Sequence, residues 1–277
     1  GNGELVLYPH MHDKKEDLRE ATIEVTNKSF LHIQREIMSS YINNYHIIKL
    51  HGKLNKEIRE NVIKILNNLL ALQIIEEDST KIIAKDFLNI KDISIKDIVR
   101  RLDFVTRSIL EKCIGTINQD RYEAIAQIDA TINKFMYLMY RIVKNVLNNK
   151  SNIKSLNVSM PHLLTSWILV NNLEHISDEA RRFARFLKKS NLKQKEKEEL
   201  AILLKELQAM YVDIMKAHYT NDKDLAHSVL DKKQYVIDMC NEALETCTTK
   251  NCGPSIEKIK GIASAIRDIG RAIVVEE

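Results

Sequence analysis

Glycine and proline are scarce in this chain of 277 residues, which contains only seven glycines and three prolines. These residues most often interrupt helices and build tight turns, so their scarcity favours long helices joined by few turns. A chain so poor in glycine also offers little material for a loop that cradles phosphate, and no nucleophile elbow, P-loop, dinucleotide or kinase signature is present. We therefore do not expect an enzyme of the usual kinds.

Long apolar runs are also missing. No segment approaches the roughly 18 uninterrupted apolar residues that a membrane-spanning helix needs. The first residues, Gly1 to Tyr8, lack the basic start and the apolar stretch of a secretory signal. The net charge of +4 is too small to demand a nucleic acid as partner. We expect a cytoplasmic protein without membrane insertion.

Cysteines are few, and the four of them are scattered, at Cys113, Cys240, Cys247 and Cys252. Such a distribution in a chain of this length argues against a disulfide framework, and the spacing of the last three matches no common zinc knuckle. We expect reduced thiols, with Cys113 and Cys240 serving as small apolar residues on helix faces. Cys247 and Cys252 flank a predicted turn, and reactive thiols are the alternative for this pair.

Residues 13–92 alternate between strand and helix patterns. Period-two alternation predicts strands, and apolar residues spaced by three and four predict helices. The order βαβαββ predicts a small α/β domain with an open sheet and helices covering one face. The strands are expected at 21–25, 46–50, 72–75 and 81–84, and the helices at 30–41 and 55–69.

From Ser94 onward the pattern is helical. Ser94 and Asp97 form a capping-box pattern, and Ser159 is followed by Pro161 in a first turn. The predicted helices cover residues 94–117, 121–149, 160–190, 194–220, 223–247 and 255–275.

The second half of this helical region resembles the first half. A shift of 102 residues aligns apolar positions and also pairs Asp120 with Asp222 and Asp129 with Asp231. The match predicts two three-helix repeats, at 93–190 and 191–277, that pack together as a bundle.

One pattern carries chemical content, the sequence Glu174-His175-Ile176-Ser177-Asp178. Glu174 and Asp178 are four residues apart and share a helix face, where like charges repel unless a cation binds between them. Asp129 and Asn133 have the same spacing on the preceding helix and would face the same bundle interior. Neighbouring helices often supply carboxylates to bound metal ions. The alternative is a solvated charged face, and the basic residues 181–189 are then expected to complement the helix dipole.

The segment Leu173–Ala180 resembles the Leu-Glu-Arg-Ile-Gly-Asp-His-Ala sequence of the third helix in PhoU-like phosphate-uptake regulators. The duplicated three-helix pattern fits that family. The βαβαββ stretch, with Tyr45–Gly52 and Lys85–Leu88, resembles the middle region of archaeal PhoU-like regulators. Gly3–Pro9 resembles the last strand of the AbrB-like swapped-hairpin DNA-binding domain that begins those proteins. A tag remnant before an ordinary edge strand is the alternative for this segment.

The resemblance implies a regulator of phosphate homeostasis that is part of a transcription regulator and acts through protein–protein contacts. It implies a homodimer with a protein partner in phosphate transport or signalling. Residues 1–12 would be a truncated remnant of the DNA-binding domain, so DNA would be bound only through the missing part. A metal-free helical adaptor and a metal-dependent bundle enzyme are the alternatives. The enzyme would need histidines facing the carboxylates, and His175 points about 100° away from Glu174 around the helix.

The resemblance also implies a metal site in the first repeat, formed by Glu174, Asp178, Asp129 and Asn133. The ion would be iron, zinc, manganese or magnesium. Asn133 stands where the family has a carboxylate. The corresponding positions of the second repeat are Asp231, Tyr235, Arg267 and Arg271. Because arginine keeps its positive charge, no second metal cluster is expected there.

Overall fold

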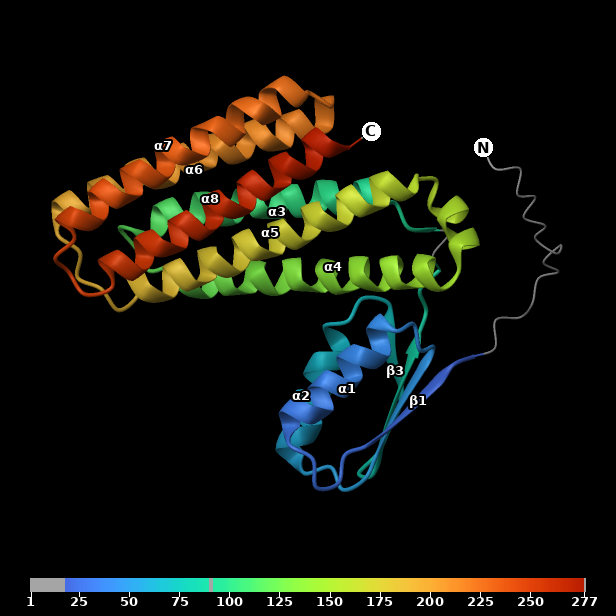
Figure 1. Cartoon of the computed structure of the whole chain (residues 1–277). Coiled ribbons are helices and arrows are strands. Elements are labelled where there is room, and N and C mark those ends of the chain that lie inside the picture. Colours follow the sequence, from blue (N-terminus) through green and yellow to red (C-terminus); the bar gives the residue numbers. More distant parts are fainter. Residues whose placement is uncertain (1–17, 90–91, 277) are drawn as a thin grey trace, which may run out of the picture. The chain divides into compact units, whose positions relative to one another are not determined.

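The computed structural model of the chain describes residues 18–89 and 92–276 (Figure 1). The chain divides into two compact units, one ending at Leu88 and the other beginning at Asn89. The predicted remnant of a DNA-binding domain, residues 1–12, lies outside the described residues.

The first unit has the predicted order of elements. Its sheet is mixed and has the strand order β1-β2-β4-β3, with β1 and β2 parallel and the other neighbours antiparallel. The elements are β1 (Glu20–Glu24), α1 (Phe30–Ile42), β2 (Ile47–His51), α2 (Lys56–Asn67), β3 (Leu72–Glu77) and β4 (Lys81–Asp86).

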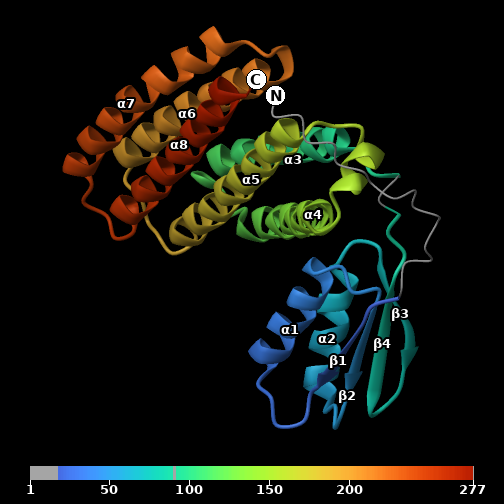
Figure 2. The same ribbon diagram turned by 45° about the vertical axis from the view of Figure 1, so that its right-hand side comes forward.

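The two helices of this unit lie on the same face of the sheet, as Figure 2 shows. In the middle of the sheet Ile48 pairs with Ala84 and Leu50 with Ile82, and all four side chains are fully buried. The helices add buried residues at their own three- and four-residue spacing, namely Ile33, Ile37 and Tyr41 from α1 and Val62 and Leu66 from α2. The alternation in the strands and the helical period therefore build one small core.

The second unit consists of six long helices, as predicted. They are α3 (Ile95–Thr116), α4 (Tyr122–Asn148), α5 (Met160–Leu187), α6 (Gln194–Thr220), α7 (Lys223–Thr246) and α8 (Cys252–Val275), with a short 3-10 segment, η2 (Lys150–Leu156), after α4. Among the described residues, no helix combines the length and the apolar character needed to cross a bilayer.

Side-chain caps mark several helix starts. Ser94 Oγ accepts a hydrogen bond from the Asp97 amide (3.2 Å), and Ser159 Oγ accepts one from the His162 amide (3.2 Å). The predicted start of α8 at residue 255 was three residues late. The Gly253-Pro254 pair lies inside its first turn, where the missing N–H of proline costs no intrahelical hydrogen bond.

The six helices pack as two groups of three. Helices α3, α4 and α5 contact one another, as do α6, α7 and α8, and the groups meet through the pairs α5–α8 and α3–α6 (Figure 1). Gly270 permits the close approach of α8 within its group, because a Cβ atom there would lie 3.1 Å from both Ile214 Cδ1 and Leu230 Cδ2. Helix α5 contacts α3, α4 and α8, and its buried residues include polar side chains such as Ser177 and Glu179.

Candidate functional site

Asp129, a predicted metal ligand on α4, faces helix α5. Its side chain is buried, and Ser177 Oγ donates a hydrogen bond of 2.8 Å to its Oδ1. Asn133, one turn further along α4, donates through Nδ2 to Asp129 Oδ2 at 3.3 Å. The structure therefore brings these two predicted residues together, with the Asn133 amide acting as a hydrogen-bond donor.

Arginine side chains connect the two aspartates of the predicted site. Arg181 Nε lies 3.0 Å from Asp129 Oδ2, and Arg181 Nη2 lies 2.6 Å from Asp178 Oδ1. Arg182 Nη2 pairs with Asp178 Oδ2 at 2.5 Å. The helix dipole alone therefore does not account for these two arginines. They supply the positive charge at the site that a metal ion was predicted to supply.

Glu174, the fourth predicted ligand, is half-buried and makes no hydrogen bond or ion pair within the described part of the chain. Burial raises the pKa of its carboxyl, and the nearby negative charges of Asp178 and Asp129 raise it further. Burial also raises the pKa of Asp129, although the hydrogen bond from Ser177 and the charge of Arg181 oppose the rise. Negative charge around Glu174 is thus incompletely compensated.

Sequence reasoning missed a fifth member of this cluster, Glu179. Its buried carboxylate pairs with Arg182 Nη1 at 2.6 Å and with Lys258 Nζ of α8 at 3.1 Å. Gly261 leaves room for it, because a Cβ atom there would lie 2.8 Å from Glu179 Oε2. The cluster therefore reaches from α4 across α5 to α8. The sequence carries no signal for this contact, because Glu179 and Gly261 are far apart in the chain and only the fold brings them together.

The second three-helix group has a different arrangement at the corresponding positions. Arg267 Nη2 lies 2.9 Å from Asp268 Oδ1, and Arg271 Nη1 lies 3.6 Å from the same oxygen. Tyr235 is exposed. The one carboxylate among the four positions, Asp231, is exposed, and both arginines keep their positive charge, which is unfavourable for a metal ion.

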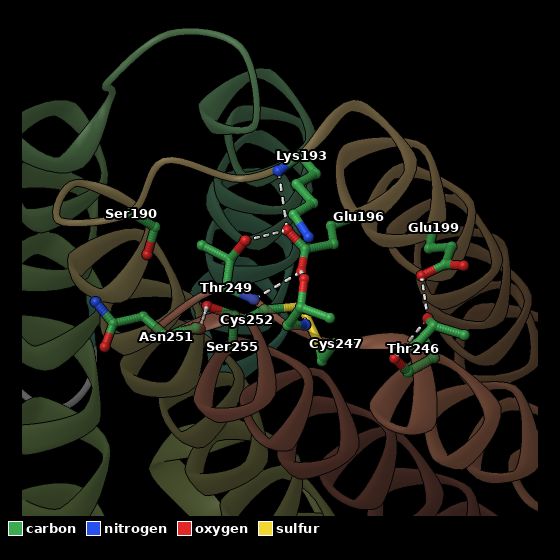
Figure 3. The surroundings of a disulfide bond; sticks show 12 residues. Ser190, Lys193, Glu196, Glu199, Thr246, Cys247, Thr249, Asn251, Cys252 and Ser255 are labelled. Atoms are coloured by element: carbon green, nitrogen blue, oxygen red, sulfur yellow. Dashed lines mark hydrogen bonds between the residues drawn. A yellow bond between two sulfur atoms is a disulfide. The ribbon is translucent and has the colours of Figure 1, made fainter.

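A disulfide joins Cys247 to Cys252, at the turn between α7 and α8 (Figure 3). The prediction that all four cysteines are reduced is therefore wrong for this pair, while Cys113 and Cys240 are free and buried. The turn brings the two Cα atoms to 5.9 Å, within the range that a disulfide spans. Asn251 in a left-handed conformation (φ 72°) reverses the chain there. A framework of several disulfides was excluded correctly, but a single local bridge needs only such a turn.

Glu196, in the first turn of α6, lies beside this disulfide (Figure 3). It is only 3% exposed, yet it accepts hydrogen bonds from the amides of Lys193 (2.9 Å), Thr248 (2.8 Å) and Thr249 (2.8 Å). The hydroxyls of both threonines donate as well. Burial by itself would raise the pKa of Glu196, but these hydrogen bonds outweigh it and lower the pKa to about 2. The carboxylate is therefore an anion that fastens the α7–α8 turn to α6.

The same three side chains form a group of potential metal ligands. One ligand atom each of Glu196, Cys247 and Cys252 lie within 4.8 Å of one another. Among residues 18–89 and 92–276, these are the three histidine, cysteine or acidic side chains that lie close enough together to hold one metal ion. Ligand spacing along the sequence could not reveal it, because Glu196 is 51 residues from Cys247.

A third polar cluster, centred on the buried Asp103, joins α3 to α6. Asp103 accepts hydrogen bonds from the hydroxyls of Tyr211 (3.0 Å) and Tyr219 (3.1 Å) and from Arg107 Nε (2.9 Å). Burial raises the pKa of both tyrosines, and the charge of Asp103 raises it further, so both stay protonated donors. This cluster is a connection between the two helix groups.

Comparisons with known proteins add no assignment: no family model, no curated protein and no solved structure matches the chain.

Proposed function

We propose that this chain is a PhoU-like regulatory protein of phosphate homeostasis that acts through protein–protein contacts, as part of a transcription regulator. The observation that carries the proposal is the acidic cluster on α4 and α5. It contains the segment whose residues resemble the PhoU motif, and Asp129 and Asp178 lie together in it, bridged by Arg181. The two groups of three helices support the proposed repeats at 93–190 and 191–277.

The proposal includes a homodimer in the cytoplasm. Pairing of two copies is tested by the mass of the purified chain in solution. If the measured mass is that of a monomer at every accessible concentration, the proposed dimer is wrong. The regulatory role is tested separately.

A metal-free helical adaptor is the second candidate, and the arginines favour it. Asp129 and Asp178 already have guanidinium partners, so a metal ion must displace Arg181 and Arg182 before it gains these two ligands. Only Glu174 offers a carboxylate without a partner. The donor set therefore fits an ion poorly as it stands, and no step of the proposed function depends on a metal.

Deleting the gene in its source organism tests the phosphate function. We expect phosphate uptake to rise several-fold in phosphate-rich medium, because the restraint on transport or on its transcriptional response is lost. Restoring the parent gene should return uptake to normal. A gene carrying Asp129→Ala with Asp178→Ala should restore it less well than one carrying Asp231→Ala, the matched change in the second helix group. Unchanged uptake and unchanged expression of phosphate-response genes after deletion would contradict the proposal.

The metal prediction can be tested by thermal unfolding with iron, zinc, manganese or magnesium. An ion that binds only the folded chain stabilises it by mass action. At an ion concentration a hundredfold above Kd the unfolding free energy rises by about 2.7 kcal/mol, and the midpoint of thermal unfolding rises with it. We expect a clear rise for Arg181→Gln with Arg182→Gln, which together free both aspartates, and a smaller one for the parent. Adding Glu174→Ala and Asp178→Ala should abolish the rise, and Asp231→Ala should leave it intact. Equal responses from all variants would support the metal-free adaptor.

A further inference from the structure

We propose that reduction of the Cys247–Cys252 disulfide converts this end of the bundle into a binding site for a zinc-type divalent ion. Its ligands are the two thiolates and the Glu196 carboxylate. The site lies where α6 begins and where α7 passes into α8 (Figure 3), and it shares no residue with the acidic cluster on α4 and α5. The proposal does not depend on the phosphate function.

The positions of the three ligand atoms fit such an ion after a small movement. They lie within 4.8 Å of one another. Tetrahedral zinc, with bonds of about 2.3 Å to sulfur and about 2.0 Å to oxygen, needs ligand atoms roughly 3.5–3.8 Å apart. The two sulfurs separate to that distance once their bond is broken. They also have to approach the carboxylate, which its backbone donors hold, by about 1 Å.

The local backbone also suits a pair of zinc thiolates. Four residues separate the two cysteines, a spacing found between paired zinc ligands. Cys252 is the first residue of α8, where the partial positive charge of the helix N-terminus favours a thiolate. By contrast, Cys113 and Cys240 lie singly on helices, and neither belongs to a group of potential ligands among the described residues. Metal-binding sulfur is thus confined to the turn.

Glu196 supplies the oxygen ligand of the proposed site. Its backbone donors, the amides of Lys193, Thr248 and Thr249, fix the carboxylate in place. The two threonine hydroxyls are exchangeable, because they can rotate away and leave a lone pair to the metal. The carboxylate then loses the hydrogen bonds of the two hydroxyls and gains the bond to the ion, while its three hydrogen bonds from backbone amides remain.

Thiol chemistry makes occupancy dependent on redox state. A dithiol reductant passes two electrons and two protons to the disulfide, giving two thiols and an oxidised, disulfide-bonded reductant. The incoming ion then displaces both thiol protons. In the disulfide form neither sulfur is a thiolate, so the site cannot hold the ion. Three protein ligands leave the fourth position to water, as in zinc sites with an open coordination position.

Cobalt(II) binding to the full chain tests the proposal, because cobalt reports thiolate ligation by its charge-transfer absorption. The chain is reduced without oxygen by a phosphine, which binds metal weakly, and is then titrated with cobalt(II). We expect one equivalent to bind with thiolate absorption, zinc to displace it, and the disulfide form to show none. Cys247→Ser with Cys252→Ser should remove the absorption, whereas Cys240→Ser should retain it. Glu196→Gln should weaken binding about tenfold or more.

Two outcomes would overturn the site. One is a reduced parent chain, still helical by circular dichroism, that shows no thiolate absorption with cobalt(II). The other is thiolate absorption that persists when both Cys247 and Cys252 are serine. Because the reduced and oxidised forms of the parent are compared directly, the test stands even where a variant folds poorly.

Discussion

Asp103→Ala should strongly destabilise the helical unit. It removes the shared acceptor of Tyr211 and Tyr219 and the partner of Arg107. The buried Tyr211 hydroxyl then loses its acceptor on α3, and breaking a buried ion pair typically costs about 3–5 kcal/mol. Because Arg107 is partly exposed, we expect a loss of roughly 3 kcal/mol and a Tm lower by about 6–12 °C.

Chemical denaturation of the parent and the variant measures this loss, and Glu111→Ala is the matched control. Glu111 lies on the same helix but is exposed, so its removal should change the unfolding free energy by less than about 0.5 kcal/mol. Tyr211→Phe, which deletes one donor and keeps the ring, should cost about 1 kcal/mol. A loss for Asp103→Ala no larger than that for Glu111→Ala would show that the cluster does not hold α3 to α6.

Glu196→Gln should weaken the chain at neutral pH and have little effect in strong acid. The amide keeps the size of the side chain but removes the charge that accepts hydrogen bonds from three backbone amides and two hydroxyls, at a cost of roughly 2–3 kcal/mol. The folded-state pKa of about 2 lies below the ordinary value of 4.5. The carboxylate therefore contributes stability that is fully present above pH 4.5 and is lost as the pH falls through about 2.

The difference in unfolding free energy between parent and Glu196→Gln should consequently shrink as the pH falls from 4.5 towards 2. Urea denaturation at a series of pH values measures it. Glu198→Gln, a change at an exposed position in the same turn of α6, should show no such dependence. A difference that stays constant across this range would mean that Glu196 is not the acceptor that fastens the α7–α8 turn.

Much of the fold was predictable, because periodicity is a local property. The apolar spacing placed all six helices of the second unit and the order βαβαββ of the first, and caps such as Ser94 and Ser159 marked helix starts. The start of α8 was misplaced because a glycine–proline pair is common both before a helix and in its first turn. The residue at which such a helix begins depends on whether the surrounding packing places the glycine–proline pair before the helix or in its first turn.

The sites were less predictable, because their chemistry depends on contacts between distant residues. The i, i+4 spacing placed Glu174 and Asp178 on one helix, but it could not show that Arg181 turns back to pair with Asp129 of another helix. The partnership of Glu179 with Lys258 and the approach of Glu196 to Cys247 likewise span long stretches of sequence. The charge of a residue was readable from the sequence, while the identity of its partner was not.

The pairing of α5 with α8 has a consequence for how the chain is made. A growing chain emerges from the ribosome N-terminal end first, and its domains fold as they appear. Helices α3, α4 and α5 can associate early, but the face of α5 that packs against α8 stays uncovered until α8 itself has been synthesised. During that interval the buried Glu179 of α5 lacks its partner Lys258 and the cover that Gly261 of α8 provides. A chaperone therefore has the largest uncovered surface to protect after α3, α4 and α5 have been synthesised and before α8 has.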